Sequence, residues 1–260
     1  MSDALAGQVD NPSATRVRAT VRLPQSFSAA ERARLYHLMS EHFANVSPQA
    51  FANDLAEKDW VIALADAGGE LQGFSTLVRR EINVDDQPLA MFYSGDTVID
   101  DRYWGSISWL GVWLRHVVDL VEATPDLPAY WLLLTATHRT YRFLPGFYHE
   151  YWPRPDRETP PEIARLIEAM VRTKFPTEYD AAAGVVRLHE AVPVHAERAA
   201  HIARGIDELK SSDPYVDFFC RRNPGYLRGD FLACTTRLSR ENLKPLGQRL
   251  LKMRLSEEKS

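Results

Sequence analysis

One carboxylate stands in a run of apolar residues, where a charged side chain is costly. Asp96 follows Ser94 and Gly95 in the segment Gln87–Asp101, whose other members are mostly apolar. A carboxylate in such surroundings has a perturbed pKa and is suited to accept a proton in catalysis. A buried Asp that accepts backbone hydrogen bonds is the alternative. Asp96 is therefore predicted as a general base, and Gly95 is expected to mark a β-bulge that opens the strand.

A phenol and an imidazole follow the next predicted strand. A tyrosine holds its proton at neutral pH and can donate it to a developing anion, whereas a histidine titrates near pH 6.5. Tyr141 is a candidate for this chemistry, with Tyr148 and Tyr151 as rivals because Pro145 breaks or kinks the helix that carries them. His138 is predicted as a further proton-transfer residue, with a surface or capping role as the alternative.

The loop after Asp101 is the candidate binding site for an anion. Its candidate residues are Arg102, Trp104, Gly105, Ser106 and Ile107. A helix is predicted directly after them, and the backbone N–H groups at a helix N-terminus attract anions such as phosphates. Arg102 adds a guanidinium that can hold a phosphate through two hydrogen bonds, with a solvated loop arginine as the alternative.

Two strands joined by a helix must position these groups. The strand Gln87–Asp101, the helix Ser108–Ala123 and the strand Pro128–Thr137 form a predicted βαβ unit. Its two strands are therefore expected to be parallel. An aromatic helix, Thr140–Trp152, is predicted to follow, and His138, after the second strand, would lie near the opening of the substrate cleft.

The residues before this unit predict a strand, two helices and a hairpin. The strand is Thr15–Leu23, and the helices Ser28–Phe43 and Ser47–Lys58 each begin at a capping serine. The hairpin spans Trp60–Ile82 around Ala67-Gly68-Gly69, where glycine supplies the positive φ of a tight turn.

The residues after Pro153 predict strands separated by a long, largely helical insertion. The strands are Ala183–Glu190 and Phe231–Leu238. Between and around them the pattern predicts helices at Glu162–Thr173, His195–Ser212 and Ser239–Met253. The segment Asp213–Asp230 is predicted to be irregular and aromatic, with a turn at Asn223-Pro224-Gly225 and an Arg–Asp pair.

This order of elements resembles the GNAT acyltransferase superfamily over roughly Val17 to Trp152. The resemblance implies an α/β (α+β) fold with a mixed, mostly antiparallel sheet flanked by helices, a long insertion between the last two strands and a C-terminal helix. It also implies transfer of an acyl group from a thioester, acyl-CoA or acetyl-CoA, to a small-molecule nucleophile, chiefly an amine. The donor pyrophosphate would lie on the loop, and its pantetheine would run between the fourth and fifth strands.

The loop departs from the glycine-rich pattern of that superfamily. One register places Arg102, Gly105 and Ile107 on the three pattern positions, and another places Trp104, Ile107 and Trp109 there. Bulky residues in place of glycine keep phosphates away from the backbone, so a thioester on an acyl-carrier protein is the alternative donor. Val98 is counted among the donor-binding residues because backbone N–H groups of its strand can polarise the thioester carbonyl.

In the family's corresponding helix a tyrosine often precedes a Gly-Phe pair, and it typically protonates the departing thiolate. Here Tyr141 stands five residues before Gly146-Phe147, one more than usual. The resemblance therefore implies the same role for Tyr141. The dense aromatic residues around it are expected to be mainly core, with some lining an acyl or acceptor pocket.

Composition and charge limit the remaining classes of function. The 260 residues carry a formal net charge of -4, which argues against a nucleic-acid partner. Sequence patterns indicate no membrane insertion, no secretory signal and no metal site, so a cytoplasmic protein with reduced thiols is expected. Residues 1–14 are expected to be a disordered tail, 15–153 the core and 154–260 the part that completes the same domain. The alternative function is a non-catalytic small-molecule sensor or scaffold.

Overall fold

A computed structural model describes residues 17–43, 46–103, 108–188 and 212–252. The N-terminal elements are β1 (Arg18–Arg22), η1 (Pro24–Ser26), α2 (Ala29–His42), α3 (Pro48–Ala56), β2 (Trp60–Ala65), β3 (Leu71–Val84), β4 (Gln87–Ile99) and η2 (Asp101–Tyr103). The central elements are α4 (Ser108–Glu122), β5 (Ala129–Thr135), α5 (His138–Tyr141), α6 (Phe143–Phe147) and α7 (Pro161–Lys174). The C-terminal elements are β6 (Tyr179–Asp180), β7 (Val185–Val186), α9 (Pro214–Arg222), η3 (Tyr226–Arg228), β8 (Phe231–Arg237) and α10 (Pro245–Lys252).

The described strands form a single mixed sheet. Their order is β1-β2-β3-β4-β5-β8-β7-β6, so the C-terminal strands extend the sheet beyond β5. The pair β4/β5 is parallel, and the other neighbouring strands in the described part of the chain are antiparallel. The predicted mixed, mostly antiparallel sheet and its parallel βαβ unit are therefore confirmed.

Local sequence accounts for both tight hairpins. Between β2 and β3, Gly69 has a φ of 83°, and the Asp66 carboxylate accepts bonds from the backbone N–H groups of Gly68 and Glu70. Between β3 and β4, Asp85 and Asp86 have φ values of 49° and 59°, which Asp tolerates better than most residues. These turns fix the register that brings the middle of β4 beside β3.

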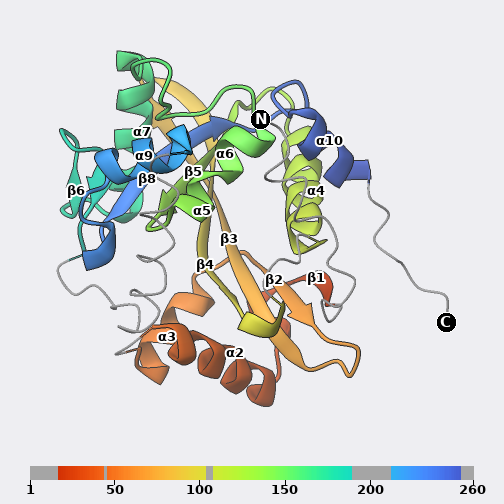
Figure 1. Cartoon of the computed structure of the whole chain (residues 1–260). Helices are drawn as coiled ribbons and strands as arrows, with labels where there is room; N and C mark the ends of the chain where they lie inside the picture. The colour runs from red at the N-terminus through yellow and green to blue at the C-terminus, as the bar shows by residue number, and fades with distance from the viewer. Residues whose placement is uncertain (1–16, 44–45, 104–107, 189–211, 253–260) are drawn as a thin grey trace.

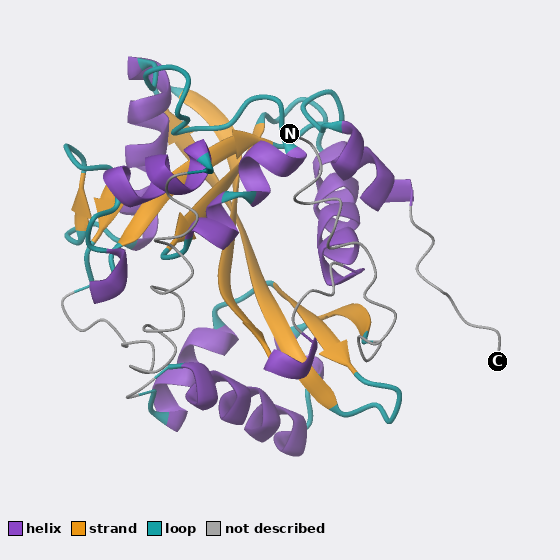
Figure 2. Ribbon diagram, in the orientation of Figure 1, coloured by secondary structure: helices purple, strands orange, loops and turns teal. Residues whose placement is uncertain are grey.

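Helices cover both faces of the sheet. Figure 1 shows α2 and α3 at one end of the long strands β3 and β4, and α5, α6, α7 and α9 at the other end. In Figure 2 the long strands run between these two groups of helices. The apolar side chains of α2 and α3 pack on β2 to β4, those of α7 pack on β4, β5 and β8, and those of α4 and α10 pack on the opposite face.

The capping predictions for the first two helices are confirmed. Ser28 accepts a bond from the backbone N–H of Glu31, whose carboxylate accepts from Ser28 in return, so α2 begins with a capping box. Ser47 caps α3 through the backbone N–H of Ala50. These caps fix where α3 begins and therefore which of its residues face β4.

The predicted aromatic helix Thr140–Trp152 is wrong as a single element. The segment forms two short helices, α5 and α6, and turns to extended backbone at Tyr148. Pro145 has no N–H to extend a helix from the preceding turn. Tyr148 and Trp152 then make isolated bridges to Leu243 and Thr235.

Three C-terminal predictions need correction. The irregular segment predicted after Asp213 contains α9, which Asp213 caps by accepting from the N–H groups of Tyr215 and Val216. Of the strand predicted at Ala183–Glu190, the described residues 183–188 contain only β7, which pairs with the unpredicted β6. The last helix begins at Pro245.

The predicted helix at His195–Ser212 and the tail 1–14 lie outside the described residues, apart from Ser212 itself. The Arg–Asp pair predicted from Arg221, Arg222 and Asp230 is not formed as expected, because Arg221 pairs with Asp217, and Asp230 pairs with Arg187 and Arg228.

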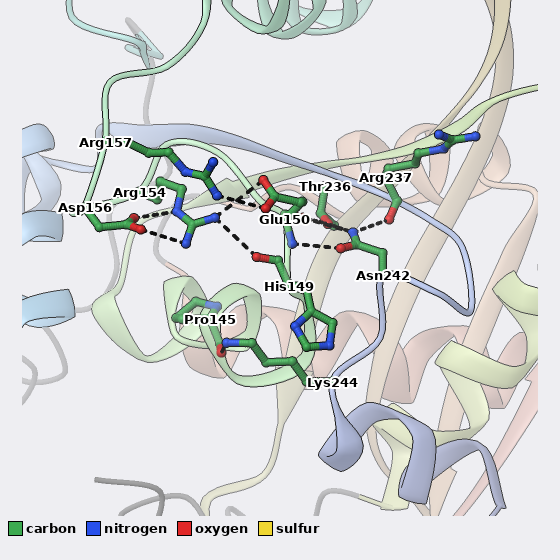
Figure 3. Close-up of polar contacts among 10 residues, drawn as sticks. All are labelled: Pro145, His149, Glu150, Arg154, Asp156, Arg157, Thr236, Arg237, Asn242 and Lys244. Carbon is green, nitrogen blue, oxygen red and sulfur yellow. Dashed lines mark hydrogen bonds and ion pairs between the residues drawn. The ribbon is translucent and has the colours of Figure 1, made fainter.

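Asn242 ties the chain after α6 to the end of β8 (Figure 3). Its side-chain oxygen accepts from the backbone N–H of Glu150 at 2.7 Å. Its amide nitrogen donates to Glu150 O, Thr236 Oγ1 and Arg237 O at 3.0, 3.0 and 2.8 Å. Asn242 is buried, so these bonds satisfy polar groups that water cannot reach freely. Lys244 adds a bond to the carbonyl of Pro145.

Replacing Asn242 with Ala should lower the free energy of unfolding by about 2 kcal/mol, because the four hydrogen bonds of its buried amide, one of them to the buried Thr236 hydroxyl, are lost. Urea denaturation of the variant would measure the loss. Asn83→Ala, at an exposed position in β3, is the matched control. A loss no larger than in that control would contradict a stabilising role for Asn242.

Candidate active site

A bulge in β4 coincides with the point where β4 and β5 separate. Ser75 pairs with Thr97 and Leu77 pairs with Ser94, so Thr76 stands opposite two residues, Gly95 and Asp96. This confirms the bulge predicted at Gly95. The parallel pairing with β5 ends just before it, at Tyr93 and Leu132.

Beyond this fork, each strand pairs on one side only among the described residues. β4 continues to Ile99 paired with β3, and β5 continues to Thr135 paired with β8. Their facing edges are not paired with each other past Tyr93. Backbone N–H and C=O groups of this kind need partners from elsewhere, so the fork can accept an extended ligand that carries amide groups.

Close backbone packing makes a glycine necessary at the bulge. A Cβ built on Gly95 would lie 2.6 Å from Thr76 Oγ1 and 3.5 Å from Lys58 Nζ. Thr76 Oγ1 is itself buried and has no hydrogen-bond partner among the described residues. The bulge therefore holds the backbone of β4 directly against Thr76 and the head of Lys58.

Asp96 belongs to a cluster of two carboxylates and two lysines. Lys58 Nζ lies 2.7 Å from Asp54 Oδ1 and 3.9 Å from Asp96 Oδ2. Lys174 Nζ lies 3.6 Å from the same oxygen of Asp54. Asp54 lies in α3, Lys58 is the second residue after the end of α3, and Lys174 is the last residue of α7. Three elements that are distant in sequence thus meet at the bulge.

Burial and a second carboxylate set the protonation of Asp96. Burial, opposed by the attraction of Lys58 and reinforced by the nearby Asp54, raises the pKa of the Asp96 carboxyl to about 6. The pKa of Asp54 is lowered despite its burial, because Lys58 and Lys174 both favour its charged form. The titrations of Asp54 and Asp96 are coupled, because each carboxylate affects the pKa of the other. Asp96 is the one that is protonated first as the pH falls.

Tyr93 completes this side of the bulge. Lys174 Nζ lies 5.2 Å from the centre of the Tyr93 ring, and Phe175 packs edge-on against the same ring. Burial raises the pKa of the Tyr93 phenol, so it stays protonated. The cluster therefore combines a carboxylate that titrates near pH 6 with a half-buried ammonium group over an aromatic ring.

Tyr141, predicted as the general acid, lies in the core. Its side chain is 0% exposed, and its hydroxyl donates to Pro153 O at 2.9 Å. Its ring packs against Tyr151, Phe218 and Phe219. A phenol whose proton is committed to a buried carbonyl is poorly placed to protonate a leaving group, so this placement favours a structural role. The rivals Tyr148 and Tyr151 are also buried.

Replacing Tyr141 with Phe distinguishes the two roles. The structural role predicts a loss of about 1 to 2 kcal/mol in unfolding free energy, because the Pro153 carbonyl loses its donor, with turnover changed less than about threefold. A general acid predicts a fall in turnover of about a hundredfold or more. Denaturation and initial rates measure both. Tyr36→Phe is the control, since Tyr36 on α2 donates a similar, partly buried bond to Val46 O.

His138 is also buried, at the start of α5. Burial, Arg139 and Arg142 lower its pKa to about 4. Its Nδ1 has no hydrogen-bond partner within the described segments. The imidazole is therefore neutral at physiological pH. The residue is 3% exposed, and no contact among the described residues joins it to Asp96.

The predicted donor-binding residues are only partly described. Trp104, Gly105, Ser106 and Ile107 lie outside the described residues. The Arg102 guanidinium makes two bonds to the Asp100 carboxylate, each 2.9 Å long, and its side chain is 65% exposed. Val98 is buried beneath α2 and α3 and pairs with Phe74, so only its backbone could face a ligand.

Sequence reasoning missed Asp54, Lys58, Lys174 and Thr76. The spacing of Asp54 and Lys58 by one helical turn was a usable signal for an ion pair, but not for its position beside β4. Most of the dense aromatic side chains are core, as expected. Some line a small apolar cavity between α4, β5 and α6, where Trp113 contacts Trp131 and Trp131 donates to Ser94 Oγ at the fork.

No cluster of three or more His, Cys, Asp or Glu side chains in the described segments is arranged to hold a metal ion. Among the described helices, none combines the length and apolar character that crossing a membrane would require.

No protein-family model and no curated protein matches the sequence. Solved structures that the chain resembles include a probable N-acyltransferase of unknown function from Enterococcus faecalis, with 13% identity and a TM-score of 0.39 over 50% of this chain and 32% of that one. The GNAT family N-acetyltransferase YhbS of Escherichia coli in complex with CoA matches with 18% identity and a TM-score of 0.37, over 51% of this chain and 69% of that one. Arabidopsis thaliana NAA60, in complex with a bisubstrate analogue, matches with 16% identity and a TM-score of 0.36, over 51% and 86%. The chain spans about a third of the Enterococcus structure.

Proposed function

We propose that this chain is an acyltransferase that moves an acyl group from a thioester, acyl-CoA or acetyl-CoA, to the amine of a small molecule. The observation that carries the proposal is Asp96. Its carboxylate lies on the β4 bulge beside the fork between β4 and β5, and its pKa is raised to about 6. A base with this pKa is largely ionised at neutral pH and can still hold a proton that it accepts.

The fork supports an extended thioester donor. A pantetheine arm carries amide groups along its length, and the unpaired edges of β4 and β5 offer backbone partners for such groups. The thioester at the end of the arm would then lie near the bulge. α4 begins at Ser108, shortly after β4 ends, so the pyrophosphate of CoA would face the N-terminal end of this helix.

The reaction requires proton removal from the acceptor. The amine nitrogen attacks the thioester carbonyl, a C–N bond forms, and the C–S bond breaks to release a thiolate. The proton lost by the nitrogen passes to Asp96, directly or through a water molecule. Lys58 lies 3.9 Å from the Asp96 carboxylate and favours its charged form, so the base is ready to accept the proton at neutral pH.

Thiol release from acetyl-CoA and longer acyl-CoAs, measured with a panel of amines between pH 5 and 9, tests the proposal. The rate should rise with pH through about 6, because only the ionised form of Asp96 accepts a proton. Acyl-phosphopantetheine, which lacks the adenosine diphosphate portion, tests a carrier-protein donor in parallel. No thiol release from any of these donors would overturn the proposal, and donor binding without release would favour the non-catalytic alternative.

A further inference from the structure

We propose that Lys174 binds a carboxylate on the acceptor, so that the acceptor is an amino acid or a similar molecule carrying both an amine and a carboxylate. The inference rests on the proposed function, because it takes Asp96 as the group that faces the acceptor amine. Lys174 would not touch the reacting atoms and would act as a specificity-determining residue.

The two lysines of the cluster differ in how their ammonium groups are used. The Lys58 side chain is 2% exposed and donates a hydrogen bond to Asp54 at 2.7 Å. Lys174 reaches the same oxygen only at 3.6 Å, is 31% exposed, and has no hydrogen bond to a described residue. An ammonium group has three donors, and of the two lysines Lys174 is the one whose ammonium group is exposed enough to offer them to a ligand.

Aromatic rings hold Lys174 in place beside the bulge. Its Nζ lies 5.2 Å from the centre of the Tyr93 ring and 5.9 Å from that of Phe175. Ring faces attract a cation without accepting its N–H bonds in the way that a carboxylate does. Burial and the neighbouring Lys58 lower the pKa of Lys174, against the opposing effects of three carboxylates, Asp54, Asp96 and Glu57. An anionic ligand group would stabilise the charged form of Lys174 further.

Charge balance favours an acceptor that carries both signs. Asp54 and Asp96 offset Lys58 and Lys174 when all four groups are ionised, and Glu57, which also acts on Lys174, is exposed so that water screens its charge. A simple ammonium ion would add one positive charge to this half-buried cluster, whereas an amino acid adds no net charge. Its ammonium group would meet the carboxylates on the β4 side, and its carboxylate would meet Lys174 at the end of α7. Desolvation of unbalanced charge is costly, so the second arrangement is favoured.

Matched acceptors test this assignment. Common amino acids and their carboxamides share the amine and side chain but differ in the carboxylate. The wild-type chain should show a kcat/KM about ten- to a hundredfold higher for the acid, which is typical of a hydrogen bond to a charged group. Lys174→Met should remove most of that preference while changing kcat/KM for the carboxamide less than about threefold. Lys174→Arg should keep part of it. Lys252→Met, at an exposed site on α10, is the control and should change nothing.

Equal kcat/KM for acid and carboxamide in the wild-type chain would overturn the inference while leaving acyl transfer intact. So would a Lys174→Met variant that lowers both values equally. Calorimetric titration of the amino acids without a donor separates this test from the proposed function. If no donor supports transfer, the binding data alone decide. Binding that requires the carboxylate and is abolished by Lys174→Met supports the proposed site. Binding that Lys174→Met leaves unchanged overturns the proposed site.

Discussion

Replacing Asp96 with Asn is expected to lower the transfer rate by about 10²- to 10⁴-fold, the usual contribution of a general base. The same change is expected to raise the melting temperature at pH 8 by a few degrees. The combination is informative because a residue kept for structure would show the opposite pattern. Asp217→Asn, at a partly exposed site on α9, is the control; it removes a surface ion pair with Arg221 and should leave the rate unchanged and stability changed by less than about 1 kcal/mol.

The expected gain in stability follows from the sign of the pKa shift. The folded chain raises the pKa of Asp96 from 3.8 to about 6, so the folded state binds this proton more tightly than the unfolded state does. The contribution of that proton to stability is fully present below about pH 4 and is lost as the pH rises through 6. Above pH 6 the ionised carboxylate is therefore a cost, and Asn removes it. With the side chain 27% exposed, the gain should be about 1 to 2 kcal/mol.

Thermal unfolding of wild type and variant at pH 5 and pH 8, together with initial rates, measures both effects. The two melting temperatures should differ more at pH 8 than at pH 5. A variant that melts lower than wild type at pH 8 and retains its rate would show that Asp96 accepts structural hydrogen bonds. That outcome would remove the base from the proposed function.

The central part of the site could be read from the sequence because its determinants are local. Glycine beside aspartate in an apolar strand indicates both a bulge and a perturbed carboxylate. Two strands joined by one helix predict parallel pairing, and β4 and β5 have it. Each of these inferences needs only neighbouring residues and general chain geometry.

The roles that depend on distant contacts could not be read in this way. Tyr141 lies in the core because α9 brings Phe218 and Phe219 against its ring. The sequence around Tyr141 does not contain that information. Lys174 likewise reaches Asp54 only through the packing of α7 against the sheet. By contrast, α9 itself had a local signal, since Asp213 before Pro214 is a strong helix start.

Replacing Lys58 with Met is expected to lower the free energy of unfolding by about 3 kcal/mol at pH 8, because it leaves two carboxylates without the cation closest to both. Methionine keeps most of the apolar stem, so the loss of charge dominates. The loss should be smaller at pH 5, since Asp96 then carries a proton and one of the two negative charges is gone.

The pH dependence of the loss follows from the effect of Lys58 on its neighbours. Lys58 lowers the pKa of both Asp54 and Asp96, so its removal raises both values in the folded state. A carboxyl whose pKa is raised by folding destabilises the chain once the pH exceeds that raised value. The unfolding free energy of the variant should therefore fall relative to wild type as pH increases. The rise of the transfer rate with pH should also move to above pH 6.

Urea denaturation at pH 5 and pH 8 and a pH–rate profile measure these effects, with Lys252→Met as the exposed control. An equal loss of stability at both pH values would attribute it to packing of the lysine stem. The double variant Lys58→Met, Asp96→Asn separates the two causes further. If the unpaired charge is responsible, removing Asp96 as well should recover part of the stability at pH 8, because the remaining Asp54 still has Lys174 nearby.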